Sequence, residues 1–192
     1  MTGRTHDLAA FTALSIVAAT NSVPQMSLGT LLVALSANFI GGLAPDVDQP
    51  TADLWHRIPA GSIIGRLITP LLGSHRYISH SIIGVYIIGF LLRIFLDNLH
   101  KILLVDMTIV WWAFMIGYIS HLFMDIFTTE GVPLLFPIPL RFGIPPFRFL
   151  RMKTGGMMEK TIVFPGLLLL AGYVYYLHYS KFLDILRHTI KY

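Results

Sequence analysis

The sequence predicts an all-α protein, a polytopic membrane bundle of helices. Of its 192 residues, 55% are hydrophobic and only 12% are charged, whereas soluble domains carry about 25% charged residues. Five apolar stretches recur along the chain, and several approach the roughly 20 residues that a membrane-spanning helix requires. No repeat and no linker rich in Pro, Gly or Ser divides them. We therefore expect a single membrane-embedded domain over residues 1–192.

The first apolar stretch, residues 8–21, is short and lacks the cleavage pattern of a signal peptide, so we expect it to remain in the mature chain. Four longer stretches complete the expected set of five, at 27–44, 79–97, 105–127 and 161–179. Residues 51–72 mix basic residues and Trp55 with apolar ones, which is typical of an amphipathic helix in the membrane interface. Residues 131–153, rich in Pro, Phe and Arg, are expected to form an irregular segment at the same surface.

Lys and Arg residues indicate how the chain is oriented, because short cytoplasmic loops retain them in excess. Alternate threading through the five stretches places most of them on one side, which we expect to be the cytoplasmic face of the cell inner membrane: Arg4, Arg57, Arg66, Arg76, Arg141, Arg148, Arg151, Lys153 and Lys160. The opposite side receives Lys101, Lys181, Arg187 and Lys191. Because no aromatic residues accompany the basic ones in a stripe, we expect no nucleic-acid partner.

The same threading gathers ionisable residues that played no part in deriving it. They fall at the cytoplasmic ends of the stretches: His6 with Asp7, Asp46 with Asp48, His75 with His80, His121 with Asp125, and Glu159. Such groups cost several kcal/mol at membrane depth unless they are paired, hydrated or bound to a metal. The chain has no cysteine, so any metal must be held by His, Asp or Glu. We expect these residues to form one site.

In the segment GYISHLFMDIF, His121 and Asp125 are four residues apart, so both project from one helix face and can hold one ion. A His–Asp hydrogen bond inside the bundle explains the pair equally well. In GGLAPDVDQP, Asp46 and Asp48 alternate in what we expect to be an extended turn, where both can face a metal. The alternative is a solvated helix end, although acidic residues there oppose the helix dipole.

In GSHRYISHS, His75 and His80 are five residues apart and can converge at a loop-to-helix junction, with Ser79 or Ser81 capping the helix. Arg76 lies between the two histidines and could hold a phosphate oxygen or a carboxylate. Taken alone, it is also an ordinary arginine of a cytoplasmic loop.

Five short blocks occur in order over nearly the whole chain: MTGRTH, GLAPDVD, GSHRYISHS, GYISHLFMDIFTTEGVPLLFP and RFGIPPFRFLRMKTGGMMEK. Together they resemble the membrane-bound, metal-dependent hydrolase family of the YdjM type. Tyr77 and Ser79 depart from the family, where small residues and Thr are common. Gln49 stands where the family often has His, which suggests that position 49 supplies no essential ligand. The family is distantly similar to zinc-dependent phospholipase C and the related single-strand nucleases.

The resemblance implies hydrolysis of a phosphoester, here of a membrane lipid or prenyl phosphate, by metal-activated water. It implies two or three divalent ions, with zinc expected first, although imidazole and carboxylate ligands also suit manganese and iron. The implied metal ligands are His6, Asp46, Asp48, His75, His80, His121 and Asp125. The implied catalytic residues are Arg76, Asp48 and Glu159. One of the aspartates could instead orient a liganding imidazole.

Other classes of protein fit the pattern less well. The box HRYISH is similar to those of diiron desaturases, but these enzymes need more spaced histidines than the blocks contain. The His-Glu-x-x-His motif of metalloproteases is absent. The main alternative is a non-enzymatic metal-binding membrane protein, either a transporter or a regulator. A transporter is expected to hold its ligands near the bilayer midplane, whereas these residues gather at one rim.

Overall fold

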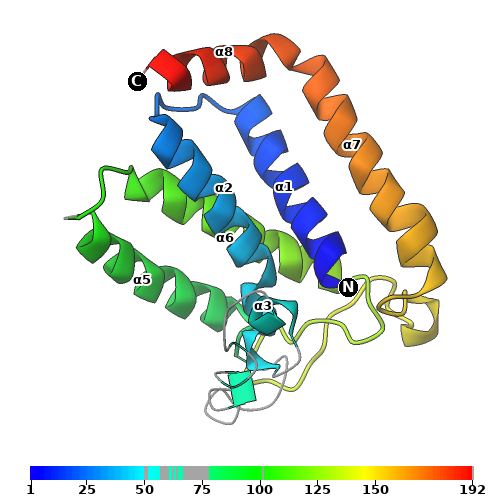
Figure 1. Cartoon of the computed structure of the whole chain (residues 1–192). Helices are drawn as coiled ribbons and strands as arrows, with labels where there is room; N and C mark the ends of the chain where they lie inside the picture. The colour runs from blue at the N-terminus through cyan, green and yellow to red at the C-terminus, as the bar shows by residue number, and fades with distance from the viewer. Residues whose placement is uncertain are drawn as a thin grey trace.

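The computed structural model describes residues 1–49, 52–56, 61, 63, 65–66, 78–100 and 102–191. Long helices dominate this part of the chain and run alternately up and down (Figure 1). No strand occurs among the described residues; two isolated bridges, Thr128 with Met152 and Val132 with Phe142, are the extended pairings found there. The prediction of an all-α membrane bundle is therefore confirmed.

Each of the five apolar stretches forms a long helix. These helices are α1 (Gly3–Thr20), α2 (Leu28–Leu43), α5 (Ile82–Leu99), α6 (Met107–Asp125) and α7 (Phe164–Leu177). Shorter elements in the described chain are η1 (Ala44–Asp48), α3 (Asp53–His56), η2 (Arg148–Leu150) and the π-helical turn η3 (Glu159–Val163). A further helix that the sequence analysis did not anticipate, α8 (Tyr179–Lys191), follows α7 directly.

Four of the described helical segments are long and apolar enough to cross a membrane: Leu28–Asp48, Ile82–Leu99, Met107–Asp125 and Glu159–Leu177. Helix α1 forms as expected but is not among these four. It carries Arg4 and Asp7, and it buries small polar residues such as Thr12 against its neighbours. Its lower hydropathy therefore reflects a helix that is packed inside the bundle, against α2, α6 and α7.

Helices α2 and α6 make the most extensive contact of the bundle. Glycines permit this approach: a Cβ atom on Gly117 would lie 2.1 Å from the Asn38 carbonyl oxygen, and one on Gly41 would lie 2.1 Å from the Phe114 oxygen. The buried Asn38 side chain donates a hydrogen bond to the Ala113 carbonyl at 2.9 Å. Small residues commonly allow membrane helices to pack this closely. The contact lies within two turns of the residues that form the candidate site.

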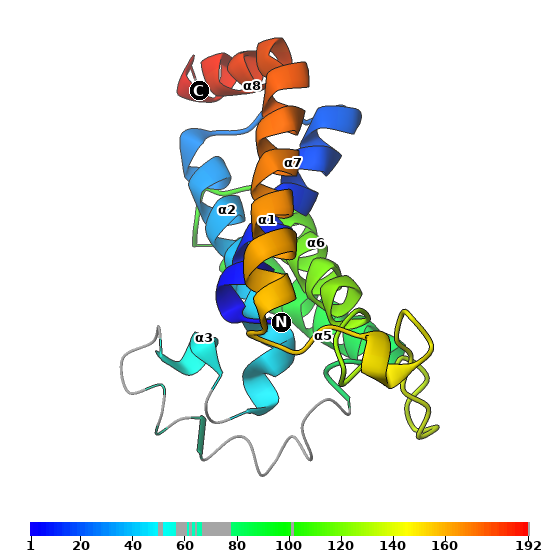
Figure 2. The ribbon, with the colours of Figure 1, turned by 90° about the vertical axis from the view of Figure 1, so that its right-hand side faces the viewer.

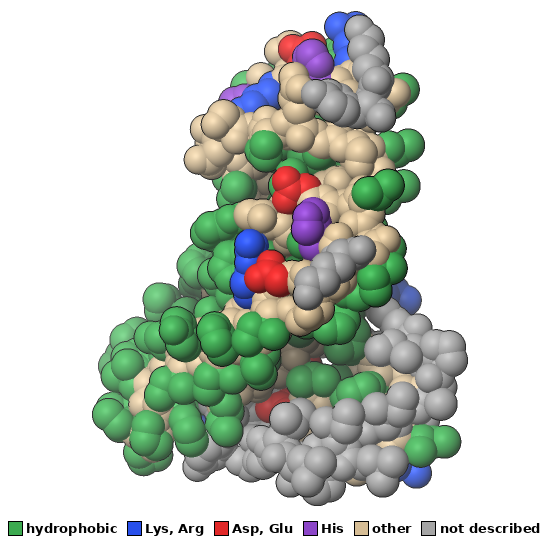
Figure 3. Space-filling model, turned by 90° about the vertical axis from the view of Figure 1, so that its left-hand side faces the viewer, with side chains coloured by type: hydrophobic (Ala, Val, Ile, Leu, Met, Phe, Trp, Pro, Cys, Tyr) green, Lys and Arg blue, Asp and Glu red, His purple; other side chains and the backbone are tan. Residues whose placement is uncertain are grey.

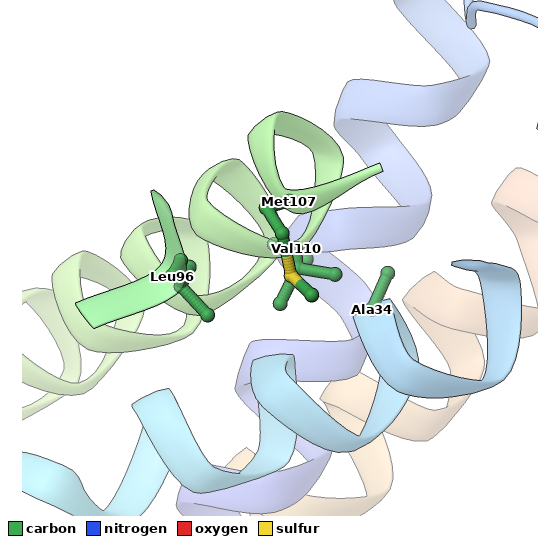
Figure 4. Close-up of a cluster of buried hydrophobic side chains, with 5 residues drawn as sticks. Ala34, Leu96, Met107 and Val110 are labelled. Atoms are coloured by element: carbon green, nitrogen blue, oxygen red, sulfur yellow. The ribbon is translucent and has the colours of Figure 1, made fainter. Parts of the chain in front are cut away.

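Farther along the same helices, apolar side chains replace the glycines. Leu96 of α5 and Met107 and Val110 of α6 pack with Ala34 of α2, and Ala113 completes this apolar cluster (Figure 4). Helix α5 presents its other side outward, with Tyr86, Phe90 and Phe95 exposed. Hydrophobic side chains cover the lower left of the face shown in Figure 3, which suits a surface in contact with lipid.

Helix α8 lies across the end of the bundle that is remote from the N-terminus (Figures 1 and 2). The Lys181 ammonium group donates to the carbonyls of Ala19 and Asn21, at 2.9 and 2.6 Å. Those carbonyls lie at the C-terminal end of α1, where a cation is favoured by the helix dipole. Charged residues alternate with apolar ones along α8, which explains why an apolar run did not reveal it.

The two predicted interfacial segments are described to different extents. Residues 126–156 are irregular apart from η2, which confirms the irregular conformation expected for 131–153. Most of 51–72 lies outside the described residues, so the predicted amphipathic helix is assessed only at α3 and a few positions beyond it. Within α3, Trp55 is buried and donates from its indole nitrogen to the Val47 carbonyl at 3.1 Å. Trp55 thus attaches this segment to η1.

Candidate metal centre

Four side chains from three segments converge at one end of the bundle. Asp46 comes from η1, His80 from the turn before α5, and His121 and Asp125 from the last turns of α6. One nitrogen or oxygen atom from each of the four lies within 4.8 Å of the others. All of them are buried except Asp46, whose side chain is 24% exposed. The predicted convergence of residues that are far apart in the sequence is confirmed for these four.

The distances within this group are too long for hydrogen bonds. His80 Nε2 lies 3.5 Å from Asp46 Oδ1 and 3.8 Å from Asp125 Oδ2, and His121 Nε2 lies 3.6 and 3.7 Å from the same two oxygens. A contact of about 3.6 Å is not a hydrogen bond. Two ligand atoms that are each about 2.1 Å from a tetrahedral zinc ion are themselves about 3.4 Å apart. The spacing therefore fits four ligands around one ion better than it fits paired side chains.

The other nitrogen of each imidazole decides which tautomer is present. His121 Nδ1 lies 2.7 Å from the Gly42 carbonyl oxygen. Because a carbonyl can only accept, Nδ1 carries a proton, and in the neutral imidazole Nε2 then holds a lone pair directed at the two carboxylates. His121 Nε2 makes no hydrogen bond within the described chain. The close α2–α6 contact is what brings the Gly42 carbonyl within reach.

His80 is oriented in the same way through a serine. The Ser79 hydroxyl donates to Asp48 Oδ2 at 2.9 Å and lies 3.0 Å from His80 Nδ1. Since the single hydroxyl proton goes to the carboxylate, Ser79 accepts from His80 Nδ1, and His80 Nε2 becomes an acceptor. The Tyr118 hydroxyl holds this turn by donating to the Ser79 carbonyl. Burial lowers the pKa of His80, which favours the neutral imidazole.

Asp46 and Asp48 do not both face the four-residue group, contrary to the expectation of an extended turn. Residues Ala44–Asp48 form the 3₁₀ helix η1, with Pro45 near its start. A 3₁₀ helix has three residues per turn, so side chains two positions apart point in different directions. Asp46 therefore faces His80 and His121, while Asp48 reaches Ser79. In this geometry Asp48 holds the His80 imidazole in place through Ser79, as second carboxylates commonly do in metal sites.

Asp125 connects the group to the start of the chain. Its Oδ2 faces His80 and His121, while its Oδ1 accepts from the Met1 amino group and lies 3.4 Å from His6 Nε2. The His6 ring stacks on that of His121, with ring centroids 3.6 Å apart. Burial, followed by the neighbouring His121, lowers the pKa of His6 to about 3. His6 thus lies beside the group as a neutral imidazole, in contact with one of its carboxylates.

Glu159 lies apart from the four-residue group and has a different environment. Its Oε1 accepts hydrogen bonds from the Thr2 backbone nitrogen and hydroxyl and from the Thr5 hydroxyl, at 2.8, 2.7 and 2.6 Å. Its Oε2 accepts from the Gly155 nitrogen at 2.7 Å. Four donors to one buried carboxylate join the beginning of α1 to η3. This environment explains Glu159 structurally, and its catalytic role stays a prediction.

The remaining predicted site residues, His75 and Arg76, lie outside the described residues. Sequence reasoning missed two groups that orient the imidazoles, the Gly42 carbonyl and, as a link between Asp48 and His80, the Ser79 hydroxyl. Ser81 is the helix cap: its hydroxyl accepts from the Gly84 nitrogen at 3.0 Å. A pocket of about 220 Å³ lies beside Asp46 and is lined also by Met1 and Gln49.

These observations define a class: a multi-pass helical membrane protein in which two imidazole nitrogens and two carboxylate oxygens meet at one end of the bundle. The sequence pattern of the YdjM inner membrane protein family matches residues 1–182. The chain therefore belongs to this family of inner membrane proteins. The family relationship in the sequence analysis is thus confirmed.

Individual relatives extend the comparison. The chain is 28% identical to the uncharacterized protein YvsG of Bacillus subtilis (strain 168) over 177 residues, which cover 92% of this chain and 96% of that protein. It is 31% identical over 120 residues to the inner membrane protein YdjM of Escherichia coli (strain K12) and to that of Shigella flexneri. That match covers 62% of this chain and 56% of each relative. No solved structure matches the chain.

Proposed function

We propose that the chain is an integral membrane metal-dependent hydrolase that cleaves a phosphoester of a lipid or prenyl phosphate at the cytoplasmic membrane face. The observation that carries the proposal is the group formed by Asp46, His80, His121 and Asp125. With both Nδ1 atoms acting as donors elsewhere, the group presents four acceptor atoms to one another. Two imidazole nitrogens and two carboxylate oxygens at this spacing suit a cation shared among them. Neutral imidazole and carboxylate together suit zinc, and also manganese or iron.

In this proposal each described residue has a stated role. Asp46, His80, His121 and Asp125 hold an ion, and Asp48 fixes the His80 ring through Ser79. A bound divalent cation supplies Lewis-acid chemistry, which activates water and neutralises charge on a phosphoryl group. His6 lies 3.4 Å from Asp125 Oδ1, beside the Met1 amino group, and its role as a ligand of one of the expected two or three ions stays part of the proposal. His75 and Arg76 are proposed as a further ligand and as the donor to the phosphoryl oxygens.

The position of the group supports a substrate that reaches it from the membrane surface. It lies at the ends of α2 and α6 and at the start of α5, rather than midway along these helices. A pocket lies beside Asp46, which belongs to the group. A metal transporter or regulator is the competing function, and it requires the ion but no hydrolysis. The distant similarity to zinc-dependent phospholipase C is part of this proposal, as is the hydrolysis.

The test is hydrolysis by the purified chain in lipid nanodiscs, loaded in turn with zinc, manganese or magnesium. Release of phosphate or of a phosphorylated headgroup is measured for phosphatidic acid, phosphatidylglycerol, phosphatidylethanolamine and prenyl phosphates. We expect cleavage of at least one substrate and a loss of roughly 100-fold or more in Asp46→Asn, as for other disturbed metal sites. Asp184→Asn, which changes an exposed carboxylate on α8, is the matched control and should retain activity.

Arg76→Lys separates the two functions further, because it keeps the charge but loses the planar two-pronged donor. We expect it to retain metal and to lose activity. A wild-type chain that binds metal but cleaves no member of the panel would contradict the hydrolase and favour a transporter or regulator. Equal cleavage by the wild type and Asp46→Asn would show that the activity does not come from this site.

A further inference from the structure

A second cavity lies in the half of the bundle remote from the four-residue group of the candidate metal centre. Its volume is about 620 Å³, within the range of roughly 300–1,000 Å³ that small-molecule sites occupy. Residues of α1, α2, α6, α7 and α8 line it, and most of them are apolar. Leu14 and Ala18 contribute from α1, Leu35 from α2, and Ile116 from α6. Three of these lining helices, α2, α6 and α7, belong to segments that are long and apolar enough to span a membrane.

The close contact between α2 and α6 separates this cavity from the four-residue group. Gly41 and Gly117 leave no room there for even one added carbon, and neither lines the cavity. On α1, the cavity begins at Phe11, more than a turn beyond His6. An occupant of the cavity would consequently not touch the ligands that the hydrolase proposal uses, and the inference goes beyond that proposal.

Several of the polar groups that line the cavity already make hydrogen bonds. The Ser15 hydroxyl donates to the Phe11 carbonyl at 2.8 Å, and the Asn21 amide donates to the Val17 carbonyl at 3.0 Å. Asp106 accepts from the backbone nitrogens of Thr108 and Ile109 as the cap of α6. Ordered water needs two or more polar partners and does not fill apolar cavities of this kind. The lining thus favours an occupant without hydrogen-bonding groups.

Helix α8 forms one wall of the cavity, and its charge indicates which kind of apolar molecule fits. Phe182, Ile185 and Leu186 from this helix line the cavity. The polar residues of α8 include the basic Lys181, Arg187 and Lys191 and the acidic Asp184, so the helix is net positive. An amphipathic helix with this charge is suited to the level of phosphate-bearing lipid headgroups. The apolar lining of the cavity matches the acyl chains of a phospholipid, and the positive charge of α8 matches its phosphate headgroup.

We propose that this cavity binds one hydrocarbon chain of a membrane phospholipid, with the lipid headgroup beside α8. The occupant follows from the mostly apolar lining, from the candidate spans α2, α6 and α7 that contribute to it, and from the positive charge of the adjoining helix α8. Such a lipid would fill the space between α1, α2 and α6 that their side chains leave open. Its binding is independent of metal and of hydrolysis.

Native mass spectrometry of the chain released from nanodiscs of phosphatidylglycerol and phosphatidylethanolamine tests the proposal. We expect one phospholipid to remain on the wild type after activation that strips the other lipids. Ala18→Phe, which places a ring in the cavity, should lower the lipid-bound fraction at least about fivefold. Ala13→Phe makes the same exchange on α1 at a partly buried position that does not line the cavity, and it should retain the lipid. Equal retention in the two variants, or none in the wild type, would overturn the proposal.

Photo-crosslinking of the wild type gives a second readout that does not depend on how a variant folds. A phosphatidylglycerol with a diazirine on one acyl chain is incorporated into the nanodiscs, and labelled peptides are identified. We expect labels at lining residues such as Leu35 and Ile116, in addition to the outward face of α5. Labels confined to outward faces, or crosslinks from the lining to a second copy of the chain, would contradict a lipid occupant.

Discussion

The two ends of helices α2 and α6 differ in the residues that line their contact. At the end that carries Asp46, His121 and Asp125, glycines bring the backbones together, and buried polar groups are held by carbonyl and hydroxyl partners. At the other end, Ala34 and Val110 belong to an apolar cluster, beside a cavity of about 620 Å³. The same pair of helices is therefore tight where imidazoles must be aimed and looser where only apolar surface is covered.

This difference indicates which end of the bundle requires precisely positioned groups. An imidazole serves as a ligand only if its other nitrogen has a fixed partner, and that partner must be positioned within a few tenths of an ångström. Gly42 supplies such a partner through its backbone, at 2.7 Å from His121 Nδ1. Apolar packing has no such directional demand. The polar end should consequently be much more sensitive to small changes than the apolar end.

The largest effect is expected for Gly117→Ala. The new methyl group would lie 2.1 Å from the Asn38 oxygen and 2.9 Å from the Gly42 nitrogen, so the helices must separate. We expect a destabilisation of roughly 2 kcal/mol, or a fall in Tm of about 5 °C in detergent. Gly172→Ala on α7, where nothing lies within 4 Å, is the control and should be neutral or stabilising. A Gly117→Ala chain as stable as this control would mean that the close contact is unimportant.

A more local effect, on metal affinity and not on stability, is expected for Ser79→Ala, which removes the link between Asp48 and His80. The His80 ring then loses the acceptor that selects its tautomer, and zinc affinity should fall by about 10- to 100-fold. Isothermal titration of the metal-free chain measures this affinity. Ser36→Ala is the matched control, because the Ser36 hydroxyl bonds only to its own helix at Leu32. Equal zinc affinities in the two variants would show that Ser79 and Asp48 do not orient His80 for metal binding.

The sequence predicted the parts of the site that depend on local geometry. His121 and Asp125 face the same way because four residues make about one helical turn, and the structure confirms that they meet. The alternation of helices was enough to bring Asp46 and His80 to the same end, since each lies directly beside a long apolar run. Such inferences need only helical periodicity and the direction of each span.

The parts that the sequence did not predict depend on contacts between segments. A carbonyl acceptor such as that of Gly42 has no side-chain signature, and Ser79 was considered only as a helix cap. The separation of Asp46 from Asp48 follows from the 3₁₀ geometry of η1, which the spacing of the two aspartates does not reveal. Helix α8 was missed because its apolar residues form a stripe rather than a run.

The central claim is that the four-residue group binds a divalent metal, and the metal content of the purified chain tests it most directly. Inductively coupled plasma mass spectrometry, after exposure to zinc and removal of loose ions, counts the metal per chain. The account predicts at least one ion in the wild type and in His188→Ala, whose exposed imidazole lies on α8. His121→Ala should lose at least one ion while still inserting into membranes. Metal-free wild-type protein, or equal metal content in His121→Ala and His188→Ala, would contradict the account.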